Sequence, residues 1–295
     1  MICAGCTSTS RSTIGGGSSG ASGSSGASGS GGASGSGGAS GSGGANGSGG
    51  AGGSSGASGS GGSDGGVSCP PDMLEIALPG SLPSYCVDRF EVTQTNYQAF
   101  LDSAPSVNAQ AAYCSWNLDF KPKSDGIESC NPGQFAPTTT PKHPVRCVDW
   151  CDAQAYCVSQ GKRLCGAIGG GMLATTDDAS KTKGQWYAAC SQYGSHDYPY
   201  GSSFVNGQCN VTGGSLGNAG SLTSCEGGYS GLFDMVGNVA EWQDSCNAQT
   251  GDTDKCFAKG GSAYDNNDVG RCNHSPTLRA RSYYAHHIGF RCCKD

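Results

Sequence analysis

Cysteine is the residue type that could do the most chemistry in this chain. The 295-residue sequence holds 18 cysteines, and two of them, Cys3 and Cys6, lie near its start. The spacing of the rest does not form the Cys-x-x-Cys pairs typical of zinc sites. An even, dispersed set favours disulfides formed in an oxidising compartment, with a connectivity that the spacing leaves open. The sixteen are Cys69, Cys86, Cys114, Cys130, Cys147, Cys151, Cys157, Cys165, Cys190, Cys209, Cys225, Cys246, Cys256, Cys272, Cys292 and Cys293.

Two histidines and three arginines lie near the C-terminus. His286 and His287 could bind a metal or transfer protons, but no acidic residue stands near them in the sequence, so a surface pair is the favoured interpretation. Arg279, Arg281 and Arg291 stand among aromatic residues. We expect them to pack and form ion pairs rather than to bind an anion. No sequence context indicates a nucleophilic serine or a thiol–imidazole pair.

Composition divides the chain into three parts. Residues 1–14 form a short N-terminal segment, and residues 15–66 consist almost wholly of Gly, Ser and Ala. Such a low-complexity stretch buries too little apolar surface to fold, so it is predicted to be a disordered linker. Residues 67–295 suit one domain. The net charge of -6 argues against a nucleic-acid partner, and no apolar run approaches the roughly 20 residues of a membrane span.

The N-terminal segment carries a candidate lipidation site. Ala4-Gly5-Cys6 looks like the end of a bacterial lipoprotein cleavage box, and the linker follows it as a tether would. We expect an export signal to precede it, a lipid on Cys6 as the one membrane contact, and an extracytoplasmic domain. The alternative is that Cys3 and Cys6 are ordinary thiols.

The domain opens with a predicted strand and helix. Residues 86–92 alternate polar and apolar side chains, as a half-buried strand does. Thr93 then suits the N-cap of a helix from Gln94 to about Asp102. Residues 103–142 are predicted to be a long ordered loop closed by Cys114 and Cys130.

A second helix is predicted after residue 149. Asp149 suits its N-cap, and Asp152 stands at the third helical position, where it can complete a capping box. Gly161 is the expected C-terminal stop. These two helices and the strand are the elements that must position any site farther along the chain.

Six sequence blocks follow one another along the domain. They are Val148–Leu164, Gly184–Cys190, Tyr198-Pro-Tyr-Gly201, Gly231-Leu-Phe-Asp-Met-Val-Gly-Asn-Val-Ala-Glu-Trp242, Lys259-Gly-Gly-Ser262 and Gly289-Phe-Arg-Cys292. In this order they resemble the sulfatase-modifying-factor family, whose founding member is the formylglycine-generating enzyme. The resemblance covers about residues 86–292 and implies an α+β fold, a variant of the C-type-lectin-like fold that is disulfide-rich and mostly irregular.

The resemblance implies two calcium sites. In the first, Asp234 and Glu241 would give side-chain oxygens, and Gly237 and Val239 would give carbonyl oxygens. A tight loop can offer both kinds of hard oxygen ligand that calcium prefers. The alternative is that the two carboxylates only hydrogen-bond a turn. The second site would begin at Asn210 and Val211, with Asn218 standing where the family has an acid.

The same resemblance places the family's chemistry at a thiol pair that holds copper(I). Asp265 stands at the first thiol position and Cys272 lies two residues beyond the second. Copper is therefore not expected, because a carboxylate suits copper(I) poorly. Ser262 is kept, and Ala240 replaces a tryptophan of the cleft wall. The resemblance also implies two disulfides, Cys157–Cys292 and Cys190–Cys272.

Two functions follow from this sequence. The favoured one is a calcium-stabilised binding or structural module, whose ligand is a protein, a peptide or a glycan. The alternative is a divergent oxidoreductase that oxidises a protein cysteine, with Cys272 and Ser262 as its catalytic residues. The bonding state of Cys272 decides between them.

Overall fold

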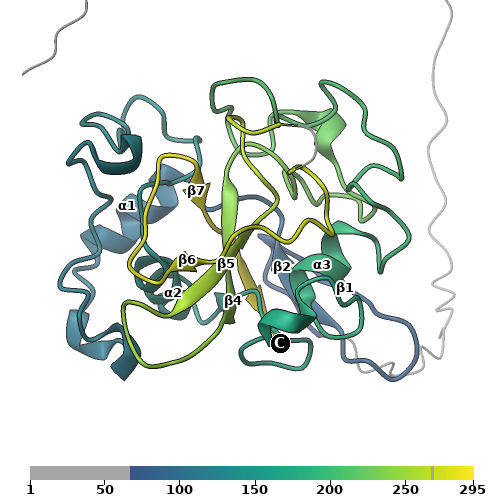
Figure 1. Cartoon of the computed structure of the whole chain (residues 1–295), viewed down its shortest axis with the longest axis horizontal. Coiled ribbons are helices and arrows are strands. Elements are labelled where there is room, and N and C mark those ends of the chain that lie inside the picture. The colour runs from purple at the N-terminus through teal and green to yellow at the C-terminus, as the bar shows by residue number, and fades with distance from the viewer. Residues whose placement is uncertain (1–66, 267–268) are drawn as a thin grey trace, which may run out of the picture. The chain divides into compact units, whose positions relative to one another are not determined.

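Two four-stranded sheets organise the domain in the computed structural model, which describes residues 67–266 and 269–295. The predicted segments 1–14 and 15–66, with Cys6, lie outside the described residues. The first sheet has the order β1-β2-β8-β3 and the second β6-β5-β4-β7. Figure 1 labels β1 and β2 of the first sheet and all the strands of the second. Only β4 and β7 are parallel among these pairs. The strands are β1 (Met73–Ile76), β2 (Tyr85–Asp88), β3 (Arg163–Leu164), β4 (Ala240–Cys246), β5 (Lys255–Lys259), β6 (Arg279–Ala280), β7 (Ile288–Gly289) and β8 (Cys292–Lys294).

Short helices and long ordered loops make up the rest of the described domain. The α-helices are α1 (Gln94–Asp102), α2 (Trp150–Ser159) and α3 (Gln185–Cys190). The loops contain short 3₁₀ helices at Val107–Ala109, Ala112–Cys114, Ile127–Ser129, Thr175–Asp177 and Thr223–Cys225. Helices that alternate irregularly along the chain with the strands of two mostly antiparallel sheets confirm the predicted α+β class. No helix in the described ranges is long and apolar enough to cross a membrane.

The predicted helix starts are confirmed. Thr93 caps α1 by accepting a hydrogen bond from the Asn96 backbone N–H. Asp149 caps α2, and its carboxylate and that of Asp152 each accept the other's backbone N–H, which completes a capping box. Gly161, at φ +66°, follows the end of α2. These local hydrogen bonds satisfy backbone donors that a helix leaves without partners.

The predicted strand at 86–92 is wrong in its extent and its exposure. The strand β2 covers Tyr85–Asp88, and all four residues are buried. It lies between β1 and β8, so both of its edges are paired. Both of its faces are also covered, so it does not show the expected half-buried alternation. After Asp88 the chain leaves the sheet. Glu91 is therefore not a strand residue, and its side chain is buried.

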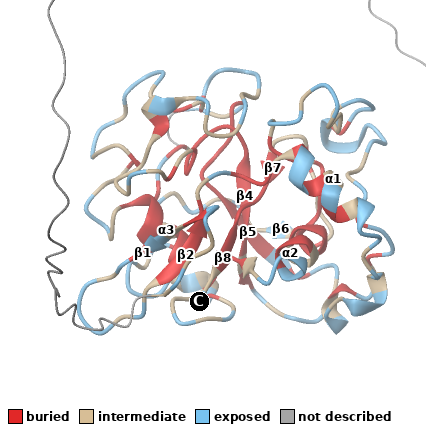
Figure 2. Cartoon of the chain, turned by 180° about the vertical axis from the view of Figure 1, so that it is seen from behind, coloured by how far each residue is buried: buried red, intermediate tan, exposed pale blue. Residues whose placement is uncertain are grey.

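Two hydrophobic clusters fill the domain. The first lies between α1, α2 and the second sheet, and the second lies around α3 and the first sheet, as the buried ribbons in Figure 2 show. Aromatic rings pack edge to face or stacked in the first cluster, which adds to the area they remove from water. The largest members of the first are Tyr97, Phe100, Trp150, Tyr156, Trp242 and Phe290, and those of the second are Trp186, Leu232 and Met235.

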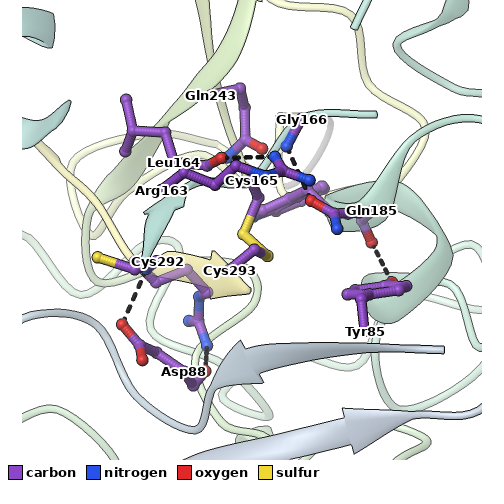
Figure 3. The surroundings of a disulfide bond; sticks show 12 residues. Tyr85, Asp88, Arg163, Leu164, Cys165, Gly166, Gln185, Gln243, Cys292 and Cys293 are labelled. Carbon is purple, nitrogen blue, oxygen red and sulfur yellow. Dashed lines mark hydrogen bonds between the residues drawn. A yellow bond between two sulfur atoms is a disulfide. The ribbon is translucent and has the colours of Figure 1, made fainter. Parts of the chain in front are cut away.

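Every cysteine of the described residues is in a disulfide. Neighbouring Cys292 and Cys293 have different partners because successive side chains of a strand point to opposite faces. Figure 3 shows the Cys165–Cys293 bond, with the Cys292 N–H donating to Asp88 nearby. The eight bonds are Cys69–Cys86, Cys114–Cys151, Cys130–Cys147, Cys157–Cys292, Cys165–Cys293, Cys190–Cys272, Cys209–Cys225 and Cys246–Cys256.

The loop at 103–142 is not closed by Cys114 and Cys130, as the sequence suggested. Cys114 is bonded to Cys151 in α2, and Cys130 to Cys147 just before that helix. The loop therefore gains two separate attachments to the helix and its approach. A loop with little core of its own is held better by bonds to a packed element than by a bond within itself.

Candidate functional site

Cys272 offers no thiol in this structure. Its sulfur is bonded to that of Cys190, the last residue of α3, and neither residue is exposed to solvent. Only a thiolate acts as a nucleophile or as a ligand for a soft metal. The structure therefore does not support the catalytic role that the oxidoreductase alternative gave to Cys272.

Asp265, at the position of the other expected thiol, caps a turn. Its Oδ2 accepts hydrogen bonds from the Ser262 backbone N–H at 2.8 Å and from the Ser262 hydroxyl at 2.7 Å. Ser262 is fully buried. Both side chains thus have a structural role, since the Ser262 hydroxyl donates to Asp265 and accepts the Tyr264 backbone N–H at 3.3 Å.

A cleft of about 180 Å³ nevertheless remains beside this turn. Ala240 lies in its wall, and its small side chain leaves this part of the cleft open. Its polar lining comes from three separate segments, which the β4–β7 and β5–β6 pairings hold in place. The polar side chains are Asp265, His274, Thr277, Arg279 and His287.

The three C-terminal arginines have different surroundings. Arg291 and Arg281 are fully buried and form ion pairs with Glu241 and Asp254, as expected. Arg279 is different: it is exposed, lines the cleft, and forms no ion pair with the described residues. Its guanidinium lies 5.0 Å from the centre of the Tyr283 ring. The sequence interpretation is wrong for Arg279 because β6 carries it to the rim of the cleft rather than into the core.

His287 also differs from the expected surface histidine. It is partly buried in the cleft, and burial lowers its pKa, with His286 lowering it further and Asp265 acting in the opposite direction. His287 is therefore mostly neutral near pH 7 and offers one N–H donor. His286 packs against Tyr264, with ring centres 4.6 Å apart.

A buried acidic cluster lies around the predicted calcium loop. Glu241 accepts hydrogen bonds from Arg291 at 2.6–2.8 Å and from the Trp186 ring N–H at 2.7 Å. The Asp234 carboxylate accepts the Gly220 N–H at 2.6 Å. Glu91, which the sequence did not single out, accepts the Asn238 side-chain amide at 2.6 Å and the Val239 N–H at 2.9 Å.

The cluster holds more carboxylates than cations. Burial raises the pKa of Asp234 to about 6 and raises that of Glu241 despite Arg291. Burial, then the charges of Asp234 and Glu241, raise the pKa of Glu91 well above its usual value. If ionised, these three carboxylates would exceed the single guanidinium of Arg291 by two charges. Uncompensated buried charge is costly, so the cluster favours a further cation or protonation.

The other predicted ligands lie next to this cluster. Asn210, Asn218 and Asp234 line one cavity of about 360 Å³, together with Asn238. The Asn210 carbonyl accepts the Asn238 N–H at 2.8 Å. These contacts bring the two predicted sites side by side, whereas the sequence gave no distance between them.

The backbone around the predicted carbonyl ligands is closely packed. Gly237 has a φ of +80°, and a Cβ there would lie 2.5 Å from the Asn210 carbonyl oxygen, so only glycine fits. Val211 and Val239 are buried and have hydrocarbon side chains, so only their backbone carbonyls could bind a cation.

The oxygen atoms around this loop are of the kinds that bind calcium, but few of them come from acidic side chains arranged around one point. Carboxylate, amide and carbonyl oxygens are the ligands that calcium prefers. Among residues 67–266 and 269–295, however, no group of three or more His, Cys, Asp or Glu side chains is arranged to hold a metal ion. A calcium ion here would therefore depend on backbone carbonyls from Gly237 and Val239, with Glu241 shared between it and Arg291.

Comparison with known proteins identifies the family. Residues 77–295 match the model of the sulfatase-modifying factor enzyme 1-like domain. The chain belongs to this family. A relative of this sulfatase-modifying factor domain, the inactive C-alpha-formylglycine-generating enzyme 2 of Bos taurus, is 30% identical over 166 residues. That match spans 50% of this chain and 49% of the relative, or about half the length of each.

Solved structures of low identity are similar to this sulfatase-modifying factor domain. CarF is 20% identical, covers 76% of this chain and 96% of its own, and has a TM-score of 0.48. PvdO from Pseudomonas aeruginosa is 17% identical, with coverages of 76% and 91% and a TM-score of 0.48. Treponema denticola variable protein 1 is 16% identical, with coverages of 75% and 94% and a TM-score of 0.45.

Proposed function

We propose that this sulfatase-modifying factor domain is an extracytoplasmic binding module that holds its ligand in the cleft of Arg279 and His287 and does not oxidise cysteine. The observation that carries the proposal is the fate of the two thiol positions. Asp265 caps the Ser262 turn, and Cys272 is bonded to Cys190. Without a thiolate pair the described domain has no soft ligand set for copper(I).

The alternative, a divergent cysteine oxidase, needs Cys272 as a thiolate. Reduction of the Cys190–Cys272 bond would release two thiols, both in the core, because neither residue has exposed surface. Neither thiol lines the cleft, so a copper(I) ion held between them would not meet a peptide bound there. A binding function needs only the open cleft.

Calcium is proposed to brace this module near Asp234 and Glu241. The excess of buried carboxylates over Arg291 supports it, because a divalent cation would balance two charges. Chelation would then return Glu91 and Asp234 to a buried site with too little positive charge. Binding of an ion to the folded state alone stabilises that state by mass action.

The extracytoplasmic location is proposed from the disulfides. Eight bonds in one domain are typical of chains that fold in an oxidising compartment. Whether Cys6 carries a lipid is a separate question, which mass spectrometry of the protein from its native host answers.

Oxygen consumption tests the loss of oxidase chemistry. The purified protein, supplied with copper(I) and a cysteine-containing peptide, should consume no more oxygen than copper and peptide alone. A double variant, Cys190→Ala with Cys272→Ala, is the matched control, and it should give the same rate as the unmodified chain. Oxygen consumption with aldehyde formation on the peptide, lost in the double variant, would contradict the proposal.

A further inference from the structure

We propose that the cleft binds the carboxylate of an acidic sugar, a uronic acid residue of a larger glycan. The inference rests on the proposed function, because it names the ligand class of the same cleft. Three features carry it: an arginine that has no ion pair among the described residues, a carboxylate with one oxygen that accepts no hydrogen bond from them, and an aromatic surface beside them.

Arg279 supplies the group that would bind the carboxylate. Its guanidinium is exposed at the cleft and pairs with no acidic side chain of the described residues. The Tyr283 ring supports it at 5.0 Å, and the Tyr283 hydroxyl donates to Glu128 at 2.9 Å. On the backbone, Arg279 pairs with Cys256 in β5. A planar guanidinium held in this way can donate two parallel hydrogen bonds to one carboxylate.

Asp265 supplies an acceptor that suits hydroxyl groups. Its Oδ2 is occupied by Ser262, but its Oδ1 takes no hydrogen bond from the described residues. A fixed carboxylate oxygen accepts well from a sugar hydroxyl, whereas it would repel a ligand that presents only anionic groups. The neutral His287 ring adds a donor on the same wall. One cation and one available acceptor therefore match a ligand with a carboxylate and hydroxyls together.

The aromatic surface lies next to these groups. Tyr264 precedes Asp265 in the chain, keeps 39% of its surface exposed, and packs against His286. Arg146 donates to the Tyr264 hydroxyl at 3.1 Å and to the His286 carbonyl at 3.2 Å, which fixes both residues. The faces of aromatic rings carry partial negative charge and attract the C–H groups on the face of a sugar ring.

The size of the cleft indicates one sugar residue of a longer chain. Its volume of about 180 Å³ is below the roughly 300 Å³ at the lower end for small-molecule pockets. The cleft therefore suits one residue of an oligosaccharide, with the next residue lying over the exposed Tyr264.

Calorimetry with the full chain tests the inference. The probes are a galacturonic acid trimer, its methyl ester, which removes the charge but keeps the sugar, and a glutamate tripeptide, which keeps the charge but removes the sugar. We expect saturable binding of the trimer and much weaker binding of the other two. The Arg279→Gln variant should bind the trimer about tenfold more weakly, the loss expected for a hydrogen bond to a charged group.

Arg271→Gln is the matched control. Arg271 is also exposed, lies 5.6 Å from the Tyr198 ring, and does not line the cleft. It should leave trimer binding unchanged. No saturable binding of the trimer, equal binding of the ester or the tripeptide, or equal losses in the two arginine variants would overturn the inference. Those results leave the binding module intact, since that proposal is tested separately, by copper-dependent turnover and by the bonding state of Cys272.

Discussion

Removal of the Cys190–Cys272 bond should destabilise the domain strongly without creating an enzyme. The bond joins the end of α3 to the segment that leads from Asp265 toward His274, and both cysteines are buried. Replacing both with alanine removes the cross-link without leaving a free thiol. The unfolded chain then regains conformational freedom that the bond had removed.

The expected loss follows from the loop that the bond closes. The bond spans 82 residues, and two inner bonds, Cys209–Cys225 and Cys246–Cys256, shorten the free path by 16 and 10. Chain entropy for a loop of this length gives about 4 kcal/mol at 25 °C, against about 3 kcal/mol for Cys246–Cys256 alone. For a domain of this size, 4 kcal/mol lowers the melting temperature by about 10 °C.

Urea unfolding followed by circular dichroism measures both double variants under the same conditions. The Cys190/Cys272 variant should lose more free energy of unfolding than the Cys246/Cys256 variant, with an unchanged dependence on urea. A smaller loss for the longer loop would refute the entropic reasoning. It would show that native contacts around α3, rather than the cross-link, hold the cleft segment in place.

Three further predictions concern the acidic cluster and α2. Gly237→Ala should cost at least about 2 kcal/mol in urea unfolding because of its positive φ and the Asn210 carbonyl. Gly251→Ala, which has open space, is its control, and equal effects would contradict the prediction. A calcium chelator should lower the melting temperature, and added calcium should restore it; an unchanged melting temperature would count against the calcium brace. Burial raises the pKa of Asp149 to about 7 and that of Asp152 well above its usual value. Folding therefore binds protons, so the free energy of unfolding from this pair should fall as pH rises from about 4 through 7. In the Asp152→Asn variant the free energy of unfolding should fall less steeply with pH. An equal pH dependence in the variant and the unmodified chain would show that this pair is not its cause.

Local signals in the sequence predicted local structure well. Helix ends depend on residues within a few positions of each other, so they can be predicted from the local sequence. This holds for the caps at Thr93 and Asp149 and for the stop at Gly161. The family blocks predicted the fold because their order along the chain is itself specific. Both features need no knowledge of which distant segments meet.

Contacts between distant segments were the part that local patterns missed. Glu91 lies 148 residues from Val239, whose N–H it accepts, so nothing near it in the sequence marks it as part of an acidic cluster. Its one signal is a carboxylate between Phe90 and Val92. Cys114 and Cys130 are bonded near α2 rather than to each other because the loop packs against that helix.

The arginines near the C-terminus also show that local sequence does not predict contacts between distant segments. Arg279 and Arg281 stand two positions apart in an aromatic context, yet Arg281 is buried against Trp150 and Arg279 lies at the cleft. The sequence gave both the same interpretation. They differ because β6 pairs with β5 only through Arg279 and Ala280, so Arg281 lies in the turn that follows and is not held on the face of Arg279.

The thiol and disulfide state of the native protein tests the central claim most directly. Non-reducing peptide mapping by mass spectrometry, after alkylation of the intact protein, reports the partner of each cysteine. The account predicts a Cys190–Cys272 cross-linked peptide and no alkylated cysteine between Cys69 and Cys293. Alkylated Cys272 in the native protein would contradict it, because a free thiol beside the cleft would return the chain to the cysteine-oxidising members of its family.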